Sequence, residues 1–178
     1  PIGTALRGRV TAVAHSLVRF NGDVIAAGRF QYAQDERAPS VARWDGLRWH
    51  AMGQDSLYNR EDGSVHRLAV LDGVLFACGT MQFAANDSVV RVAAWDGARW
   101  VPLPDQPDEA VVAMTVYQNE LVIAGGFRHV GGTEARGLAA WNGEAWRELG
   151  AATLRGREAL VTALCAAGDS LVAAGWFD

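Results

Sequence analysis

The chain has 178 residues, with 16 Lys and Arg against 20 Asp and Glu, which gives a formal net charge of −4 at pH 7. This acidic balance argues against nucleic-acid binding, which usually needs a basic face. Hydrophobic residues make up 50% of the chain, enough for a substantial core. They form no run of about 18 residues, so we expect no membrane-spanning helix.

The first pattern along the chain is a short apolar segment that ends at a glycine. A glycine follows such a segment at positions 28, 79, 125 and 175, so the pattern returns about every 50 residues. Short apolar runs that end in glycine are typical of buried β-strands. The copies are Val24–Phe30, Leu75–Met81, Val122–Phe127 and Val172–Phe177.

The second pattern is a small apolar residue, a Trp, an Asp-Gly or Asn-Gly pair, two further residues and a second Trp. Asp-Gly and Asn-Gly tolerate positive φ at both centres of a type I′ turn, so the pattern predicts the tip of a β-hairpin with a Trp on each side. Its period matches that of the glycines, which indicates an internal repeat. The copies are Ala42–Trp49, Ala94–Trp100 and Ala140–Trp146.

Each repeat divides into four short strands: one before a tight turn, the glycine-terminated strand, one that ends at the first Trp, and one that begins at the second Trp. No stretch shows a sustained helical period, so we expect almost no helix. We place the repeats at 10–53, 64–104, 110–150 and, incomplete, 160–178. The first strands are predicted at Leu17–Phe20, Leu68–Leu71, Ala113–Tyr117 and Ala163–Ala167, and the residues Val10–His15 are assigned to no strand.

The glycine segment followed by Ala-x-Trp-Asp-Gly-x-x-Trp resembles the kelch and galactose-oxidase-like β-propeller repeats. It is closest to the repeats of bacterial secreted proteins and fungal cortical-marker proteins. The resemblance covers nearly the whole chain, although the Gly-Gly pair usual in kelch stands only at Gly125-Gly126. It implies an all-β propeller arc of four-stranded antiparallel blades. About three and a half blades are present, fewer than a typical closed propeller, so we expect part of a larger or oligomeric propeller.

In a propeller, the loops between the second and third strands share one face with the loops that lead into the next repeat. We call this the loop face. Convergent loops on a rigid scaffold commonly carry function, so the candidate binding residues are the charged and aromatic residues of these loops. They are Tyr32, Asp35, Arg37, Tyr58, Arg60, Asp62, His66, Arg128, His129, Arg136 and Arg155.

The Trp pairs recur with the period of the core, so we interpret them as structural rather than as a ligand platform. We expect the first Trp of each pair to be largely buried against a neighbouring blade. Cys78 and Cys165 lie in apolar runs and are both expected to be buried. The six tryptophans of the pairs are Trp44, Trp49, Trp95, Trp100, Trp141 and Trp146.

Nothing in the sequence indicates catalysis or a cofactor. There is no nucleophile elbow, P-loop or dinucleotide fingerprint. The acidic loop at 54–63 does not match an EF-hand, and the four histidines have no zinc-ligand spacing. Galactose oxidase uses a copper site of His and Tyr with a Cys-linked Tyr, but Cys78 lies within a strand and the motifs around the copper ligands are absent. The residues considered for copper are Tyr32, Tyr58, His66 and His129.

We therefore expect a non-enzymatic recognition scaffold with no cofactor or metal, binding protein through the loop face at the cell surface or outside the cell. Its partner would be another protein or further blades, from the same chain or another copy. One alternative is a carbohydrate-binding, lectin-like propeller, for which Tyr32 and Tyr58 are the available loop aromatics. Another is that these are structural blades of a larger propeller enzyme.

Overall fold

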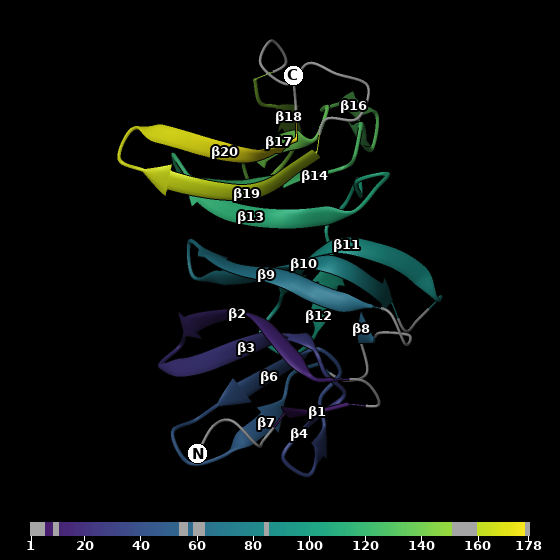
Figure 1. Cartoon of the computed structure of the whole chain (residues 1–178), viewed down its shortest axis with the longest axis vertical. Helices are drawn as coiled ribbons and strands as arrows, with labels where there is room; N and C mark the ends of the chain where they lie inside the picture. The colour runs from purple at the N-terminus through teal and green to yellow at the C-terminus, as the bar shows by residue number, and fades with distance from the viewer. Residues whose placement is uncertain are drawn as a thin grey trace. The chain divides into compact units, whose positions relative to one another are not determined.

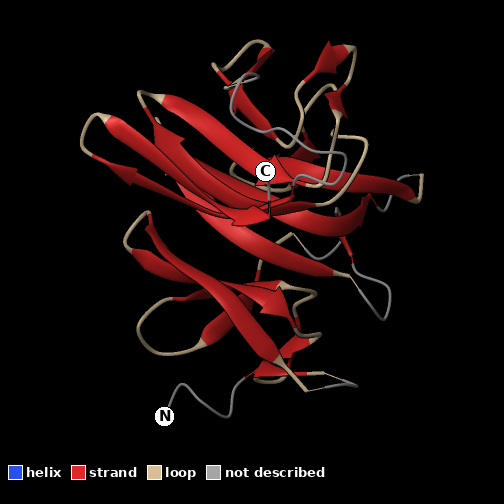
Figure 2. Cartoon of the chain, turned by 45° about the horizontal axis from the view of Figure 1, so that its top comes forward, coloured by secondary structure: helices blue, strands red, loops and turns tan. Residues whose placement is uncertain are grey.

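The computed structural model describes residues 6–8, 11–53, 57–58, 63–83, 86–150 and 160–176, and of Leu57, Tyr58 and Phe83 only the backbone. The described residues form strands and turns and contain no helix (Figure 2), so none of them form a helix that could cross a membrane. The chain divides into two compact units, Pro1–Pro102 and Leu103–Asp178, and each is described by itself.

The first repeat is a four-stranded antiparallel sheet in unit one, with the strand order β2-β3-β6-β7 (Figure 1). Consecutive long strands are neighbours, as in a meander. A second, small sheet of three short strands, β1-β4-β5, is formed by the loops of this repeat. The strands are β1 (Leu6–Arg7), β2 (Val13–Phe20), β3 (Asp23–Arg29), β4 (Tyr32–Ala33), β5 (Glu36–Arg37), β6 (Val41–Trp44) and β7 (Trp49–Ala51).

The second repeat, also in unit one, has the same order, β9-β10-β11-β12, with the short strand β8 added where β10 extends beyond the core of the sheet. All of these pairings are antiparallel. The strands are β8 (Leu57–Tyr58), β9 (Ser64–Leu71), β10 (Val74–Phe83), β11 (Ser88–Trp95) and β12 (Trp100–Pro102).

Unit two holds the third repeat, β13-β14-β17-β18, and a two-stranded fourth repeat, β19-β20. The predicted all-β architecture of repeated four-stranded antiparallel units is confirmed. The first strands begin earlier than predicted, and part of the unassigned segment before Ser16 is the start of β2. The strands are β13 (Val111–Tyr117), β14 (Glu120–Gly125), β15 (His129–Val130), β16 (Thr133–Glu134), β17 (Leu138–Trp141), β18 (Trp146–Glu148), β19 (Leu160–Ala167) and β20 (Ser170–Trp176).

The repeated glycine is explained by a β-bulge in the strand that faces it. In the first repeat Ala14 and Ser16 pair with the consecutive residues Gly28 and Ala27, which leaves His15 as the bulged residue. A Cβ atom at Gly28 would overlap the carbonyl oxygen of Val13. Glycine is therefore required there by the close approach of two backbones. The bulge and the blocked glycine Cβ recur in the other three repeats, at glycines 79, 125 and 175.

The turn inside each Trp hairpin differs from the prediction. Trp44 pairs with Trp49, so the loop has four residues rather than two. Gly46 has a φ of 99°, but Asp45 is not in the left-handed region, so a type I′ turn is wrong here. Instead Asp45 Oδ1 accepts hydrogen bonds from the backbone N–H groups of Leu47 and Arg48 at 2.8 and 2.9 Å. This Asx turn recurs at Asp96 and Asn142.

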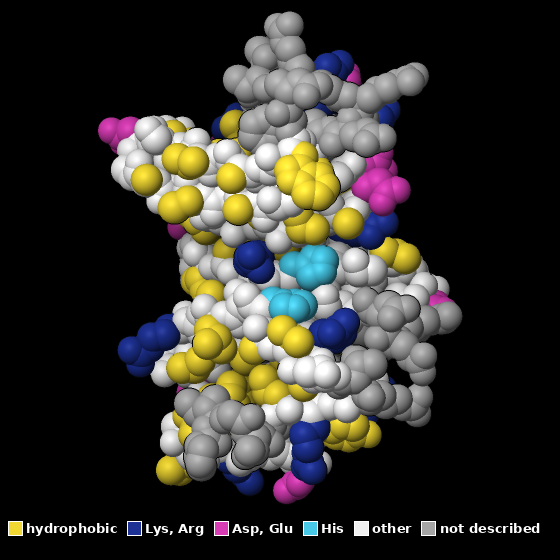
Figure 3. Space-filling view, viewed as in Figure 1, with side chains coloured by type: hydrophobic (Ala, Val, Ile, Leu, Met, Phe, Trp, Pro, Cys, Tyr) yellow, Lys and Arg dark blue, Asp and Glu magenta, His cyan; other side chains and the backbone are white. Residues whose placement is uncertain are grey.

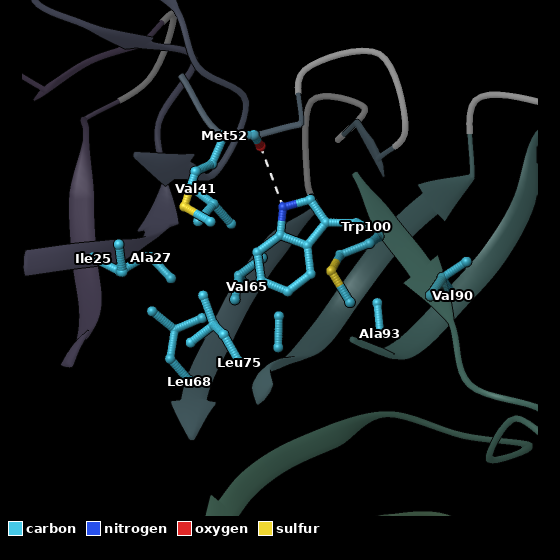
Figure 4. Packing of buried hydrophobic residues seen from close by; sticks show 12 residues of the cluster. Ile25, Ala27, Val41, Met52, Val65, Leu68, Leu75, Val90, Ala93 and Trp100 are labelled. Atoms are coloured by element: carbon cyan, nitrogen blue, oxygen red, sulfur yellow. Dashed lines mark hydrogen bonds between the residues drawn. The ribbon is translucent and has the colours of Figure 1, made fainter. Parts of the chain in front are cut away.

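Apolar side chains shared by the first two repeats form one core in unit one (Figure 4). A separate core of unit one lies between the sheet of the first repeat and its own loops, and a core in unit two joins the third and fourth repeats. The second Trp of each hairpin is buried in all three complete repeats. The first Trp is buried only in the third repeat, at Trp141, whereas Trp44 and Trp95 are partly buried and pack against the two cores of unit one. The rings of each pair contact one another, with centroids 5.3 to 5.5 Å apart.

Candidate functional site

Within each complete repeat the loops are joined by backbone pairing. The segment that precedes the first strand pairs with the loop between the second and third strands: β1 with β4, β8 with the end of β10, and Pro107 with Val130. In the first and third repeats the described loop residues therefore form one projection at one end of the sheet, while for the second repeat only the pairing of β8 with β10 is described. Each projection is described within its own unit.

The first-repeat projection is charged and exposed. Tyr32 pairs with Arg37 across the β4–β5 hairpin, and with Arg7 of β1 on its other side. The Arg7 guanidinium lies 2.9 Å from Asp35 Oδ1 and also donates to the carbonyl oxygen of Gln34. Three of the predicted residues, Tyr32, Asp35 and Arg37, are thus brought together here. The ion pair is solvated, so it contributes little to stability.

Interactions with the fourth strand hold this projection in place. The side chain of Gln34 accepts a hydrogen bond from the backbone N–H of Trp49 at 2.9 Å, and Glu36 accepts one from Ala51 at 2.9 Å. Because both donors belong to β7, the β4–β5 hairpin is attached to the sheet by side chains as well as by the chain itself. The sequence prediction missed Gln34 and Glu36, since loop polarity alone gives no sign of these contacts.

The second-repeat candidates do not form a comparable cluster among the described residues. The backbone of Tyr58 pairs with Gln82, while Arg60 and Asp62 lie outside the described residues, as does Arg155, which precedes the fourth repeat. His66 is not in a loop. It is the bulged residue of β9, and its ring lies 6.0 Å, centroid to centroid, from the ring of His15 (Figure 3 shows the two histidines side by side).

The third-repeat projection is built around Asp108. One carboxylate oxygen accepts hydrogen bonds from the backbone N–H groups of Arg128 and His129, at 2.9 and 3.2 Å, and the other lies 3.1 Å from His129 Nδ1. Burial acts to raise the pKa of the Asp108 carboxyl. The hydrogen bonds from these backbone groups and from the His129 side chain outweigh burial, so its pKa is lowered.

A second ion pair in this projection joins Glu134 and Arg136, with 2.8 Å between Nε and Oε1. The hydrogen bond from Arg136 lowers the pKa of the Glu134 carboxyl. The hairpin is closed by Ala135, whose backbone N–H donates to the carbonyl oxygen of Arg128 at 2.8 Å. The predicted residues Arg128, His129 and Arg136 therefore belong to one cluster. Its two acidic members, Asp108 and Glu134, were not predicted, because their spacing matches no motif.

The chemistry of these groups is that of solvated ion pairs. Among the described residues, no group of three or more His, Cys, Asp or Glu side chains could hold a metal ion. Of the residues considered for a copper site, His66 contacts His15 and His129 contacts Asp108. Both projections present charge and hydrogen-bonding groups on a fixed backbone, an arrangement suited to recognising a polar surface.

Neither the protein-family models nor the curated proteins compared with this chain gave a match.

Proposed function

We propose that the chain is a segment of a kelch-like β-propeller and that it acts as a non-enzymatic recognition scaffold, binding a protein through the loop projections. The observation that carries this proposal is the backbone pairing between the loops of each repeat, seen for β1 with β4 and for Pro107 with Val130. The pairing fixes charged side chains such as Arg7, Asp35 and Arg37 on a hydrogen-bonded backbone. Rigid surfaces lose little conformational entropy on binding, which favours recognition.

The proposal assigns the contact to arginine-bearing loops. Arg37 of the first repeat and Arg128 of the third are exposed on β5 and just before β15. Arginine is enriched in protein interfaces because its planar guanidinium stacks and forms paired hydrogen bonds with carboxylates. The expected partner surface is therefore acidic.

Binding to an array of purified extracellular proteins tests the proposal. The double variant Arg37→Glu/Arg128→Glu changes two projections, and Arg48→Glu/Arg99→Glu makes the same change of charge in two Trp-hairpin turns. A partner that binds the wild-type chain and the turn variant but not the loop variant supports the proposal. Partners that are lost equally from both variants, or retained by both, would contradict it.

Carbohydrate binding is the second candidate, favoured by the exposed ring of Tyr32 on β4. Sugars stack on exposed aromatic rings, so Tyr32→Ala should abolish a glycan-array signal, while Arg37→Glu/Arg128→Glu should leave it largely intact. This opposite pattern separates the two functions. A glycan-array signal that Tyr32→Ala leaves unchanged would remove carbohydrate binding from this projection.

A further inference from the structure

The first strands of the first two repeats carry a histidine at the same structural position. His15 is the bulged residue of β2, and His66 is the bulged residue of β9. A bulge leaves its extra residue outside the regular ladder and re-aims its side chain. The bulged residues of the third and fourth repeats are Val112 and Thr162, so these repeats place no imidazole there.

Contacts between β2 and β9, which both belong to unit one, hold the two bulges next to each other. Ser16 Oγ accepts a hydrogen bond from the backbone N–H of Leu68 at 3.1 Å, and His15 Nδ1 lies 3.3 Å from the carbonyl oxygen of Val65. These two contacts lie on either side of His66 along β9. The strands themselves therefore set the position of one histidine relative to the other.

The contact with Val65 also determines which nitrogen of the His15 ring carries the proton. A carbonyl oxygen can only accept, so Nδ1 donates the hydrogen bond. In the neutral ring Nε2 then keeps its lone pair, and such a nitrogen is a common metal ligand. Metal-binding histidines are usually oriented by a hydrogen bond from the other ring nitrogen to a carbonyl or carboxylate oxygen. His15 already has this arrangement.

The rings of His15 and His66 are close enough to share one ion. Their centroids are 6.0 Å apart, and the ring planes are inclined at 52°. With metal–nitrogen bonds of about 2.0–2.1 Å, two imidazoles on one ion have centroids roughly 5 to 6.5 Å apart, so small side-chain rotations suffice. His15 is exposed and His66 is half-buried, so an ion and its water ligands can reach the pair (Figure 3).

We propose that His15 and His66 form a binding site for a divalent transition-metal ion. Its protein ligands are Nε2 of His15 and one ring nitrogen of His66, and water fills the remaining positions. An imidazole has two nitrogens, so a ring can bind an ion through one and keep a hydrogen bond through the other. The ion would link the first strands of two repeats. The proposal does not depend on recognition through the loop projections.

The donor set decides which ions bind. Imidazole suits Cu²⁺, Ni²⁺ and Zn²⁺, whereas Mg²⁺ and Ca²⁺ prefer oxygen ligands. Arg67 adds a positive charge beside the pair, because its Nη1 donates to the carbonyl oxygen of His66 at 2.8 Å. This charge opposes cation binding, and a dedicated zinc site has three or four protein ligands rather than two. We therefore expect reversible binding, with Cu²⁺ held more tightly than Ni²⁺.

Calorimetric titration of the full chain with Ni²⁺ tests the site. Cys165→Ser serves as the background for every variant, because an exposed thiol can also bind metal. The background should bind one Ni²⁺ per chain, reversibly with EDTA, and should not bind Mg²⁺. Loss of an outer-shell partner alone weakens a metal site by about 10- to 100-fold, so His15→Gln and His66→Gln should each weaken binding at least as much. The double variant should bind no more weakly than either single variant.

The matched control is His129→Gln. His129 is also exposed, but it contacts the Asp108 carboxylate rather than a second histidine. This variant should bind Ni²⁺ like the background. Unchanged thermal unfolding of all variants without metal verifies that a loss of binding is not a loss of fold.

A second measurement needs no substitution of the ligands. In NMR spectra of the background, substoichiometric Ni²⁺ should broaden the ring signals of His15 and His66 together, before those of His50 and His129. The proposal is overturned if the background binds no Ni²⁺, if either His15→Gln or His66→Gln binds as tightly as the background, or if His129→Gln loses binding equally. Equal broadening of all four histidines would also overturn it.

Discussion

The indole Nε1 of Trp100 donates a hydrogen bond to the backbone carbonyl oxygen of Met52 at 3.2 Å, and so ties the second repeat to the end of the first (Figure 4). Trp146 makes the corresponding bond in unit two, to the carbonyl oxygen of Pro104 at 3.3 Å. In both cases the second Trp of a hairpin reaches the segment after the preceding fourth strand. The Nε1 atom of Trp49 is also buried but has no hydrogen-bond partner in the described part of the chain.

This difference predicts unequal effects for the same substitution. Trp100→Phe and Trp49→Phe remove the same ring volume, but only Trp100→Phe leaves a buried carbonyl group without its donor. Trp100→Phe should therefore lower the free energy of unfolding by about 1–2 kcal/mol more than Trp49→Phe. Urea denaturation of the two variants measures the difference. Equal losses would show that the bond to Met52 contributes nothing to stability.

The bulge opposite each repeated glycine predicts a severe effect at Gly79. Gly79→Ala places a Cβ atom against the carbonyl oxygen of Ser64, which is backbone and cannot rotate away. The sheet must shift, so we expect a loss of about 3 kcal/mol or more. Gly132→Ala is the control, because a Cβ there meets nothing within 4 Å and Gly132 has no positive φ. It should change stability by less than about 0.5 kcal/mol, and similar losses for both variants would contradict the role of the bulge.

The four-strand repeat could be predicted from the sequence because period, turn residues and apolar runs all coincide in every copy. The burial order within the Trp pairs could not, because both members of a pair are tryptophan in an apolar strand end. What distinguishes Trp100 from Trp95 is that its indole reaches Met52 of another repeat. The Asx turn could not be predicted for a related reason. Asp-Gly is compatible both with a two-residue type I′ turn and with a four-residue loop that an Asx turn closes, and the pairing of the two strands decides which one forms.

The sequence predicted which charged residues lie in the loops, but not which residues they contact. The sequence places Arg128, His129 and Arg136 close together simply because they are near in the chain. Asp108 is 20 residues earlier than Arg128 and joins them only because Pro107 pairs with Val130. Contacts of this kind depend on how two loops meet, and no local pattern encodes them.

Asp108 predicts a pH dependence in the third-repeat projection. Its pKa in the folded chain is lowered, so its contribution to stability is fully present above the pKa of the unfolded chain, ordinarily 3.8, and is lost as the pH falls through the folded value. Asp108→Asn should therefore have a lower free energy of unfolding than the wild type at pH 6, and this difference should become smaller below pH 4. Chemical denaturation of both proteins from pH 6 to pH 2 measures the difference. A difference that stays constant with pH would mean that Arg128 and His129 do not stabilise the charge of the carboxylate.

The two cysteines should differ sharply in reactivity. Cys78 is fully buried in β10, and burial raises the pKa of its thiol to about 12, so almost no thiolate forms at neutral pH. Cys165 lies exposed on β19, so the expectation that it is buried is wrong. A thiol reagent such as 5,5′-dithiobis(2-nitrobenzoate) should therefore release one equivalent of chromophore from the native chain and two from the chain unfolded in guanidinium chloride. Cys165→Ser should abolish the native reaction, whereas Cys78→Ala should leave it unchanged as long as the chain stays folded.

Two equivalents from the native wild type at the rate seen in denaturant would show that the core around Cys78 opens freely, contrary to its position between β9 and β11. One equivalent released from native Cys165→Ser would place the reactive thiol at Cys78 and overturn the assignment.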